Sequence, residues 1–240
     1  MGIRVKQWRS GMLILSAILS LGLTPAAPGP SRDSKSMKRI LVFGDSLSEG
    51  FGLTPNQAYP VVLAAKLGAE GLHYVITNAS QSGGTTDDGL HRLSPHLKPR
   101  IDIFILELGI NDAFRGVPIE EIRNNLQEII NRVRRANPKV RIVICGMQLP
   151  NYTEDDYVSS FGRMYQEIAA NNNAALVPYL LAGVGGDPAL NQEDGIHPNA
   201  AGQKILAENV WRVLKPIARE VAGLSSREER GSSQSKSGPR

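Results

Sequence analysis

The chain has 240 residues, of which 41% are hydrophobic and 21% charged, a composition that is ordinary for a soluble globular domain with terminal extensions. Its single cysteine, Cys145, excludes an intramolecular disulfide. The net charge of +4 falls to about +1 without Arg4, Lys6 and Arg9, and no basic stripe with interleaved aromatic residues remains, which argues against a nucleic-acid partner.

Residues 1–26 have the layout of a secretory signal peptide. Met1–Arg9 is basic, Met12–Leu23 is apolar and uncharged, and the small residues that follow suit a signal peptidase. The apolar block is shorter than the ~20 residues that span a bilayer. We therefore expect cleavage and export to the periplasm or the exterior, with an uncleaved membrane anchor as the alternative.

Composition divides the rest of the chain into three parts. Residues 27–37 are rich in proline, serine and small residues and are interpreted as a linker. Residues 38–223 form the expected globular domain, and residues 224–240, which are nearly free of apolar side chains, are expected to be a disordered tail. We expect a monomer without stable membrane insertion once the leader is removed.

Within the domain, short apolar runs alternate with longer amphipathic ones. The expected strands, in chain order, are Arg39–Phe43, His73–Thr77, Ile101–Leu108, Val140–Cys145 and Ala175–Val177. The expected helices are Asn56–Leu67, Asp87–Leu97, Ile119–Ala136, Tyr157–Asn171 and Asn199–Val221. Apolar strands separated by helices predict an α/β domain, a three-layer α/β/α sandwich with a five-stranded parallel sheet.

Polar turns that contain glycine follow three of these strands, at residues 44–48, 78–84 and 109–112, and a fourth precedes the last helix at residues 194–198. In parallel sheets, ligands bind beyond the carboxyl ends of the strands. The four turns are therefore expected to meet at one edge of the sheet.

These turns carry the residue types of a serine hydrolase. A serine hydroxyl such as Ser46 needs an adjacent base, which His197 supplies, and Asp194 stands close enough to fix the histidine tautomer. The oxyanion of an acyl-transfer intermediate needs donors, for which the Ser46 N–H, the Gly83 N–H and the Asn111 amide are candidates. Glycine at 83 is expected to remove a Cβ that would crowd a ligand.

The motifs Gly-Asp-Ser-Leu at 44–47, Gly83, Gly-x-Asn-Asp at 109–112 and Asp-x-x-His at 194–197 resemble the blocks of the SGNH (GDSL-type) hydrolases, in their order. The surrounding residues are similar to the bacterial exported branch of arylesterases and acyl-CoA thioesterase/lysophospholipase enzymes. The resemblance runs from about Arg39 to Leu214 and implies a flavodoxin-like sheet and hydrolysis of esters or thioesters without metal or cofactor.

By family role, Ser46 is the nucleophile, His197 the base and then the acid, and Asp194 the residue that orients the histidine, with Ser46, Gly83 and Asn111 as the oxyanion hole. Two segments depart from the expected thioesterase pattern, Met147–Asp156 and Gly183–Pro188, which by family position shape the acyl and leaving-group pockets. The resemblance therefore implies the reaction and leaves acyl-chain length undetermined.

Several substrate classes are compatible with these residues. Short and medium acyl or aryl esters are expected, with lysophospholipids and acyl thioesters as further candidates. A carbohydrate O-acetylesterase is the alternative enzyme, and a non-catalytic binding module on the same fold is the alternative from another class. The intact residue set argues against the binding module.

Other chemically active residues are interpreted as structural. His91 and His96 are five residues apart, which does not fit a zinc-binding helix. Glu107 and Asp112 are expected to hydrogen-bond locally and hold the loop that carries Asn111. Thr85–Asp88 is expected to cap a helix, and Cys145 to be a packing residue.

Overall fold

The computed structural model describes residues 37–150 and 156–223. The expected signal peptide, the expected linker apart from Met37, and the expected tail lie outside the described residues and stay predictions. Within the described ranges, no helix combines the length and the apolar character needed to cross a bilayer.

Five parallel strands form one sheet in the order β2-β1-β3-β4-β5. The strands are β1 (Lys38–Phe43), β2 (Tyr74–Asn78), β3 (Ile103–Leu106), β4 (Arg141–Cys145) and β5 (Ala175–Val177). This is the flavodoxin-like order, and it confirms the predicted five-stranded parallel sheet.

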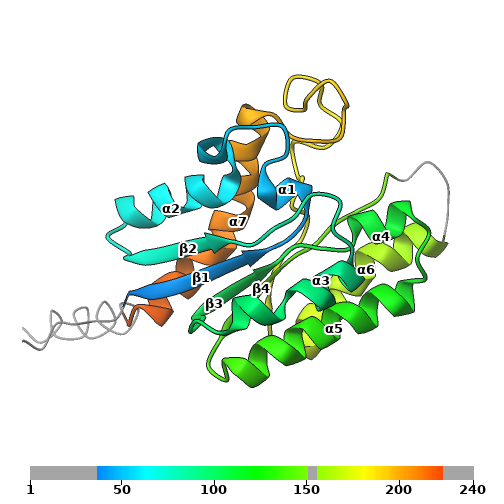
Figure 1. Cartoon of the computed structure of the whole chain (residues 1–240). Coiled ribbons are helices and arrows are strands. Elements are labelled where there is room, and N and C mark those ends of the chain that lie inside the picture. The colour runs from blue at the N-terminus through cyan, green and yellow to red at the C-terminus, as the bar shows by residue number, and fades with distance from the viewer. Residues whose placement is uncertain (1–36, 151–155, 224–240) are drawn as a thin grey trace, which may run out of the picture. The chain divides into compact units, whose positions relative to one another are not determined.

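Helices cover both faces of the sheet, which confirms the predicted three layers (Figure 1). The helices of one face are α2 (Tyr59–Ala69) and α7 (Ala200–Val221). Those of the other face are α3 (Thr86–Arg92), α5 (Ile119–Ala136) and α6 (Asp156–Asn171). The remaining helical turns are α1 (Ser46–Glu49), α4 (Ile110–Phe114), η1 (Pro55–Gln57) and η2 (Ser94–Leu97).

The core lies between these layers. All four residues of β3 are buried, because this strand has a neighbour on either side and helices above and below. Helix α5 adds an apolar stripe at 3.6-residue spacing, and each fully buried aliphatic side chain of this kind stabilises the fold by roughly 1.5–3 kcal/mol. The buried residues of this stripe are Ile122, Leu126, Ile129, Ile130 and Val133.

The structure differs from the sequence prediction in several elements. The helix expected over Asn56–Leu67 is divided into η1 and α2, and the strand expected over Ile101–Leu108 is limited to Ile103–Leu106. The helix expected over Asp87–Leu97 ends at Arg92 and continues as the short η2, because Pro95 cannot extend an α-helical hydrogen-bond ladder. The turns expected after β1 and β3 contain the short helices α1 and α4. The residues expected to carry chemistry, Ser46 and Asn111, therefore lie in the first turns of helices.

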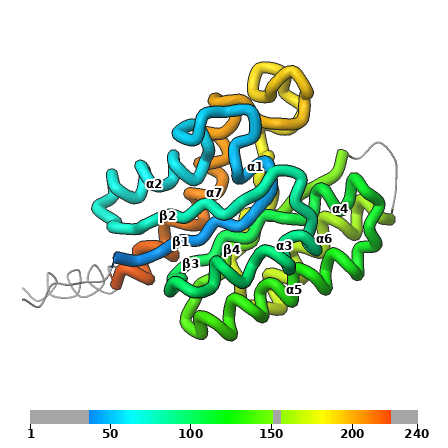
Figure 2. Tube along the Cα trace, in the orientation of Figure 1, coloured from blue at the N-terminus to red at the C-terminus, as the bar shows by residue number. Residues whose placement is uncertain are grey.

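The strand order reverses between β1 and β3, and the carboxyl ends of these two strands lead into α1 and α4. Such a switch point leaves a crevice at the edge of the sheet. The segment between β5 and α7, gold in Figure 2, extends beyond this edge and returns beside α1.

Candidate active site

Ser46 is the first residue of α1, directly after β1. Asp45 caps the helix by accepting a hydrogen bond from the Leu47 N–H at 3.0 Å, and Gly50 ends it with a φ of +84°. Because the first N–H groups of a helix have no partner within the helix, the Ser46 N–H is left free for a ligand. Ser46 is only 8% exposed and lines a cavity.

His197 lies in a closed turn between β5 and α7. The Gln192 N–H donates to the His197 carbonyl at 2.8 Å, and Gly195 turns the chain with a φ of +69°, which favours glycine. Gln192 also reaches across with its side-chain amide to the Phe51 carbonyl at 2.7 Å. The Phe51 ring then packs on the imidazole, with ring centroids 4.6 Å apart.

The serine, the histidine and the aspartate form one hydrogen-bonded chain. His197 Nε2 lies 3.0 Å from Ser46 Oγ, and His197 Nδ1 lies 2.6 Å from Asp194 Oδ2. When the proton is on Nδ1, this N–H group donates to the Asp194 carboxylate, and Nε2 accepts a hydrogen bond from the Ser46 hydroxyl. The structure thus brings together three residues from distant parts of the chain in the arrangement that activates a serine.

Asp194 is held in its ionised form by hydrogen bonds, and its side chain is partly exposed to water. Its Oδ1 accepts hydrogen bonds from the N–H groups of Ile196 and His197, both at 2.9 Å. The backbone and side-chain hydrogen bonds from His197, followed by the bond from Ile196, lower the pKa of Asp194 to about 2. The carboxylate therefore remains charged across the neutral range and fixes the histidine tautomer.

The turn that contains Gly83 is tied to the Ser46 loop. The Gln81 N–H donates to the Gly44 carbonyl at 3.1 Å, and Ser82 donates to the Glu49 carboxylate with its N–H at 2.7 Å. A Cβ at Gly83 would meet no protein atom within 4 Å, so the expected crowding of a bound ligand stays a prediction. The φ of +73° is a separate reason for glycine at this position.

Asn111 lies in the first turn of α4 and lines the same cavity as Ser46. Its Nδ2 donates to Asp45 Oδ2 at 3.0 Å and to the Gly84 carbonyl at 3.1 Å. Both amide hydrogens therefore already have acceptors in the resting structure. To bind an oxyanion, the amide must release one of them.

The expected role of Glu107 is partly wrong. Its carboxylate binds the loop of the serine, accepting from the Asp45 N–H at 3.1 Å and from Ser48 Oγ at 2.7 Å. Asp112 accepts from the N–H and Oγ of Thr86 and thereby holds α4, which carries Asn111, against the start of α3. Asp112 thus acts as expected, and Glu107 supports a different loop because β1 and β3 are neighbours in the sheet.

The sequence did not predict a role for two buried polar residues that shape the site. Asp45 links the Ser46 helix to the Asn111 amide, as described above. Gln203 in α7 accepts from the Tyr59 N–H at 2.8 Å and donates to the Leu47 carbonyl at 3.1 Å. It therefore fixes α7, which begins just after His197, against α1. A glutamine within the buried face of an amphipathic helix was the available signal for such a role.

A cavity of about 650 Å³ opens beside Ser46 and His197. Its walls are mainly apolar, including Ile110, Phe114 and Leu149, and Phe114 is 62% exposed. The cavity is also lined by residues 147–150 and by Gly185 and Gly186, which belong to the two segments expected to shape the substrate pockets. Residues 151–155 of the first segment lie outside the described residues.

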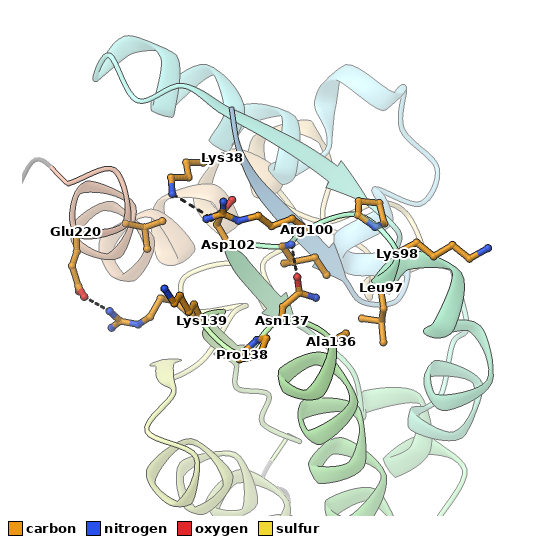
Figure 3. Close-up of a pocket in the computed structure, with 14 residues that line it drawn as sticks. Lys38, Leu97, Lys98, Arg100, Asp102, Ala136, Asn137, Pro138, Lys139 and Glu220 are labelled. Atoms are coloured by element: carbon orange, nitrogen blue, oxygen red, sulfur yellow. Dashed lines mark hydrogen bonds and ion pairs between the residues drawn. The ribbon is translucent and has the colours of Figure 1, made fainter. Parts of the chain in front are cut away.

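A larger cavity, of about 740 Å³, lies at the opposite, amino edge of the sheet (Figure 3). Its acidic side chains are engaged by basic neighbours: Asp102 pairs with Arg100 at 2.7 Å and with Lys38 at 3.4 Å, and Glu220 pairs with Arg141. Among the residues that the structure describes, no serine, cysteine or histidine lines this cavity. The chemistry is therefore expected in the smaller cavity.

The remaining candidates occupy structural positions. Cys145 is fully buried, and burial raises the pKa of its thiol well above the ordinary value. Thr85 caps α3 in a capping box with Asp88, as expected. His96 packs against the Phe43 ring, with centroids 6.0 Å apart. Among the described residues, no group of three or more histidine, cysteine or acidic side chains is arranged to hold a metal ion.

Three curated relatives resemble this chain over most of its length. Esterase TesA of Pseudomonas aeruginosa is 38% identical over 206 residues, which cover 85% of this chain and 98% of the relative. The arylesterase of Vibrio mimicus is 31% identical (84% and 96% covered), and thioesterase 1/protease 1/lysophospholipase L1 of Escherichia coli K12 is 32% identical (74% and 84% covered).

A crystal structure of TesA has the same fold, with a TM-score of 0.71 and 39% identity over 75% of this chain and 99% of that one. Residues 42–205 match the GDSL-like lipase/acylhydrolase family. This match covers more than half of the chain and includes Ser46, Gly83, Asn111, Asp194 and His197. The chain is therefore a member of the GDSL-like lipase/acylhydrolase family.

Proposed function

We propose that this protein is a serine esterase that hydrolyses carboxylic esters through an acyl-enzyme on Ser46. The observation that carries the proposal is the hydrogen-bonded chain from Asp194 through His197 to Ser46 Oγ. The relatives named above are esterases and a thioesterase/lysophospholipase, which supports the same reaction class.

In the proposed mechanism, Ser46 Oγ attacks the ester carbonyl while His197 Nε2 takes the hydroxyl proton. The imidazolium that forms is stabilised by the Asp194 carboxylate and then protonates the departing alkoxide. A water molecule, deprotonated by His197, attacks the acyl-enzyme, and the carboxylic acid is released. The Ser46 N–H, the Gly83 N–H and the Asn111 amide are the proposed donors to the oxyanion.

For substrate, we propose short and medium acyl or aryl esters, with lysophospholipids and acyl thioesters as further substrates. The apolar wall of the 650 Å³ cavity suits a hydrocarbon chain better than a sugar ring, which needs several polar partners. We further propose that the protein acts after export, on the basis of the signal-like residues 1–26.

A p-nitrophenyl ester series from acetyl to dodecanoyl, measured beside acetylated xylan, tests this proposal. We expect hydrolysis of the p-nitrophenyl esters, including chains longer than acetyl, and its loss in Ser46→Ala. Activity on acetylated xylan with none on longer acyl chains would replace the proposal with a carbohydrate O-acetylesterase. Equal activity of Ser46→Ala and the natural chain would refute the nucleophile.

A further inference from the structure

Two buried carboxyl groups lie beneath the candidate nucleophile, and the proposed reaction steps use neither. Asp45 and Glu107 are both fully buried, at the exits of the neighbouring strands β1 and β3. Burial of an ionised acid destabilises the folded protein unless hydrogen bonds or opposite charges replace the lost hydration. The hydrogen bonds of Asp45 and Glu107 therefore indicate what each side chain contributes to the site.

Asp45 joins the nucleophile to an oxyanion donor. One carboxylate oxygen accepts from the Leu47 N–H in α1, and the other accepts from the Asn111 amide, both at 3.0 Å. The second amide hydrogen meets the neutral Gly84 carbonyl at 3.1 Å. A bond to an ionised carboxylate is stronger than one to a neutral carbonyl, so an oxyanion would displace Gly84 while Asp45 keeps the amide in place.

Glu107 supports the same loop from below. One carboxyl oxygen accepts from the Asp45 N–H and from Ser48 Oγ, which also lies 2.8 Å from the Tyr59 hydroxyl. The other oxygen, Oε1, is buried and makes no hydrogen bond with any described residue. An unpaired oxygen of this kind disfavours the charged form, so Glu107 is the member of the pair that binds a proton more readily.

We infer that Asp45 and Glu107 are positioning residues for ester hydrolysis: ionised Asp45 holds the Asn111 amide toward the oxyanion, and protonated Glu107 fixes the peptide that joins Asp45 to Ser46. The inference rests on the proposed function of Ser46. Asp45, which directly precedes the nucleophile, then influences the rate of ester hydrolysis through its negative charge.

The groups around Asp45 and Glu107 determine the pH range over which Asp45 ionises. Burial raises the pKa of Asp45 to about 6, against the lowering effects of the Leu47 hydrogen bond, of hydrogen bonding with the Glu107 side chain, and of the charges of His197 and Arg92. Burial, followed by the charge of Asp45, raises the pKa of Glu107 well above its ordinary value. The other titratable groups that face the pair, Tyr59, Tyr165 and Cys145, are buried and neutral because burial raises their pKa values. Asp45 therefore gains a proton on mild acidification.

The first test compares Asp45→Asn with the natural chain from pH 8 to pH 5, using p-nitrophenyl acetate. Asparagine has the shape of the protonated aspartic acid, so kcat should fall about 10–100-fold at pH 8, somewhat less than the loss of a complete oxyanion donor. The ratio of the two kcat values should shrink about five- to tenfold by pH 5, where most of natural Asp45 is also protonated. A merely structural defect would give a ratio of activities that does not change with pH.

Asp102→Asn is the matched control, because Asp102 is also a buried acid but lies at the opposite edge of the sheet. It should have the activity of the natural chain at every pH. A pH-independent ratio for Asp45→Asn, or full activity of this variant at pH 8, would overturn the inference.

The second test compares Glu107→Gln with Glu107→Ala. Glutamine is neutral like the protonated acid and keeps an acceptor for Ser48 and for the Asp45 N–H, so it should retain most of kcat. Alanine should lower kcat at least about tenfold with little change in KM, because it releases an oxyanion-forming loop. Equal losses in both variants would overturn the role of Glu107.

These outcomes are distinguishable from failure of the proposed function. A natural chain without Ser46-dependent esterase activity would refute the function itself. Esterase activity that depends on Ser46, together with an Asp45→Asn ratio that does not vary with pH, would refute only the positioning pair.

Discussion

Replacement of Asp45 by asparagine should change the pH dependence of folding stability as well as that of activity. The natural carboxyl is fully buried, and its pKa rises from 3.8 to about 6 on folding. Between these two values the folded chain holds a proton that the unfolded chain has already released. The free energy of unfolding therefore falls as the pH rises through this interval.

The size of the effect follows from the shift. One pKa unit corresponds to about 1.36 kcal/mol, and integration of this shift makes the natural chain lose about 2–2.5 kcal/mol between pH 4 and pH 7 on account of Asp45. Asp45→Asn has no ionisable group at this position and lacks this loss. The substitution also introduces a difference in stability that does not depend on pH. Apart from that constant difference, the stability of the variant relative to the natural chain should rise by about 2–2.5 kcal/mol over this range.

Urea unfolding followed by circular dichroism, at half-unit steps from pH 4 to pH 7.5, measures this difference. Asp194→Asn is the control variant, because hydrogen bonds lower the pKa of Asp194 and its difference in stability from the natural chain should therefore stay nearly constant over this pH range. The contribution of Asp194 is present above pH 4 and is lost as the pH falls toward 2. A difference between Asp45→Asn and the natural chain that stays constant within about 0.5 kcal/mol would refute the assignment of a raised pKa to Asp45.

Three further predictions concern the site and the core. His197→Ala should lower kcat at least about 10³-fold in the ester assay, and Asp194→Ala should lower it less; unchanged activity of His197→Ala would mean that the base is misassigned. Gly44→Ala places a Cβ 2.5 Å from the Glu107 carboxylate and 2.8 Å from the Glu107 carbonyl oxygen, so thermal unfolding should show a loss of about 1–3 kcal/mol in the free energy of unfolding. Gly68→Ala adds a Cβ on a helix with no atom within 4 Å, so this variant should be as stable as the natural chain or more stable. Equal stability of the two variants would contradict the packing around Gly44. Cys145 should react with a thiol reagent only after unfolding, and rapid labelling of the native protein would contradict its burial.

The fold could be predicted from the sequence because buried strands and helices have apolar residues in patterns that short stretches of sequence already show. In the strand expected at Val140–Cys145, residues 142–145 are a continuous apolar run and are all buried, because β4 is covered on both faces. The helix Ile119–Ala136 was predicted at its observed bounds, because its apolar spacing extends over five turns. Helices α1 and α4 have only four and five residues, too few to show a period of 3.6, and they were therefore expected to be turns.

The candidate site could be predicted in part for a related reason. Ser46, Asn111 and His197 belong to short motifs, and each motif follows a strand or precedes a helix. The functions of Asp45 and Gln203 depend instead on partners far along the chain: Asn111 lies 66 residues after Asp45, and Leu47 lies 156 residues before Gln203. Local patterns carry no information about such pairs, which only the order of strands in the sheet brings into contact.

The central claim, that Ser46 is an activated nucleophile, is tested most directly by labelling the full chain with a fluorophosphonate and mapping the adduct by peptide mass spectrometry. The account predicts one adduct, located on Ser46, that is absent in Ser46→Ala and strongly reduced in His197→Ala. Labelling of another residue, or labelling that persists at full rate without the His197 imidazole, would contradict it.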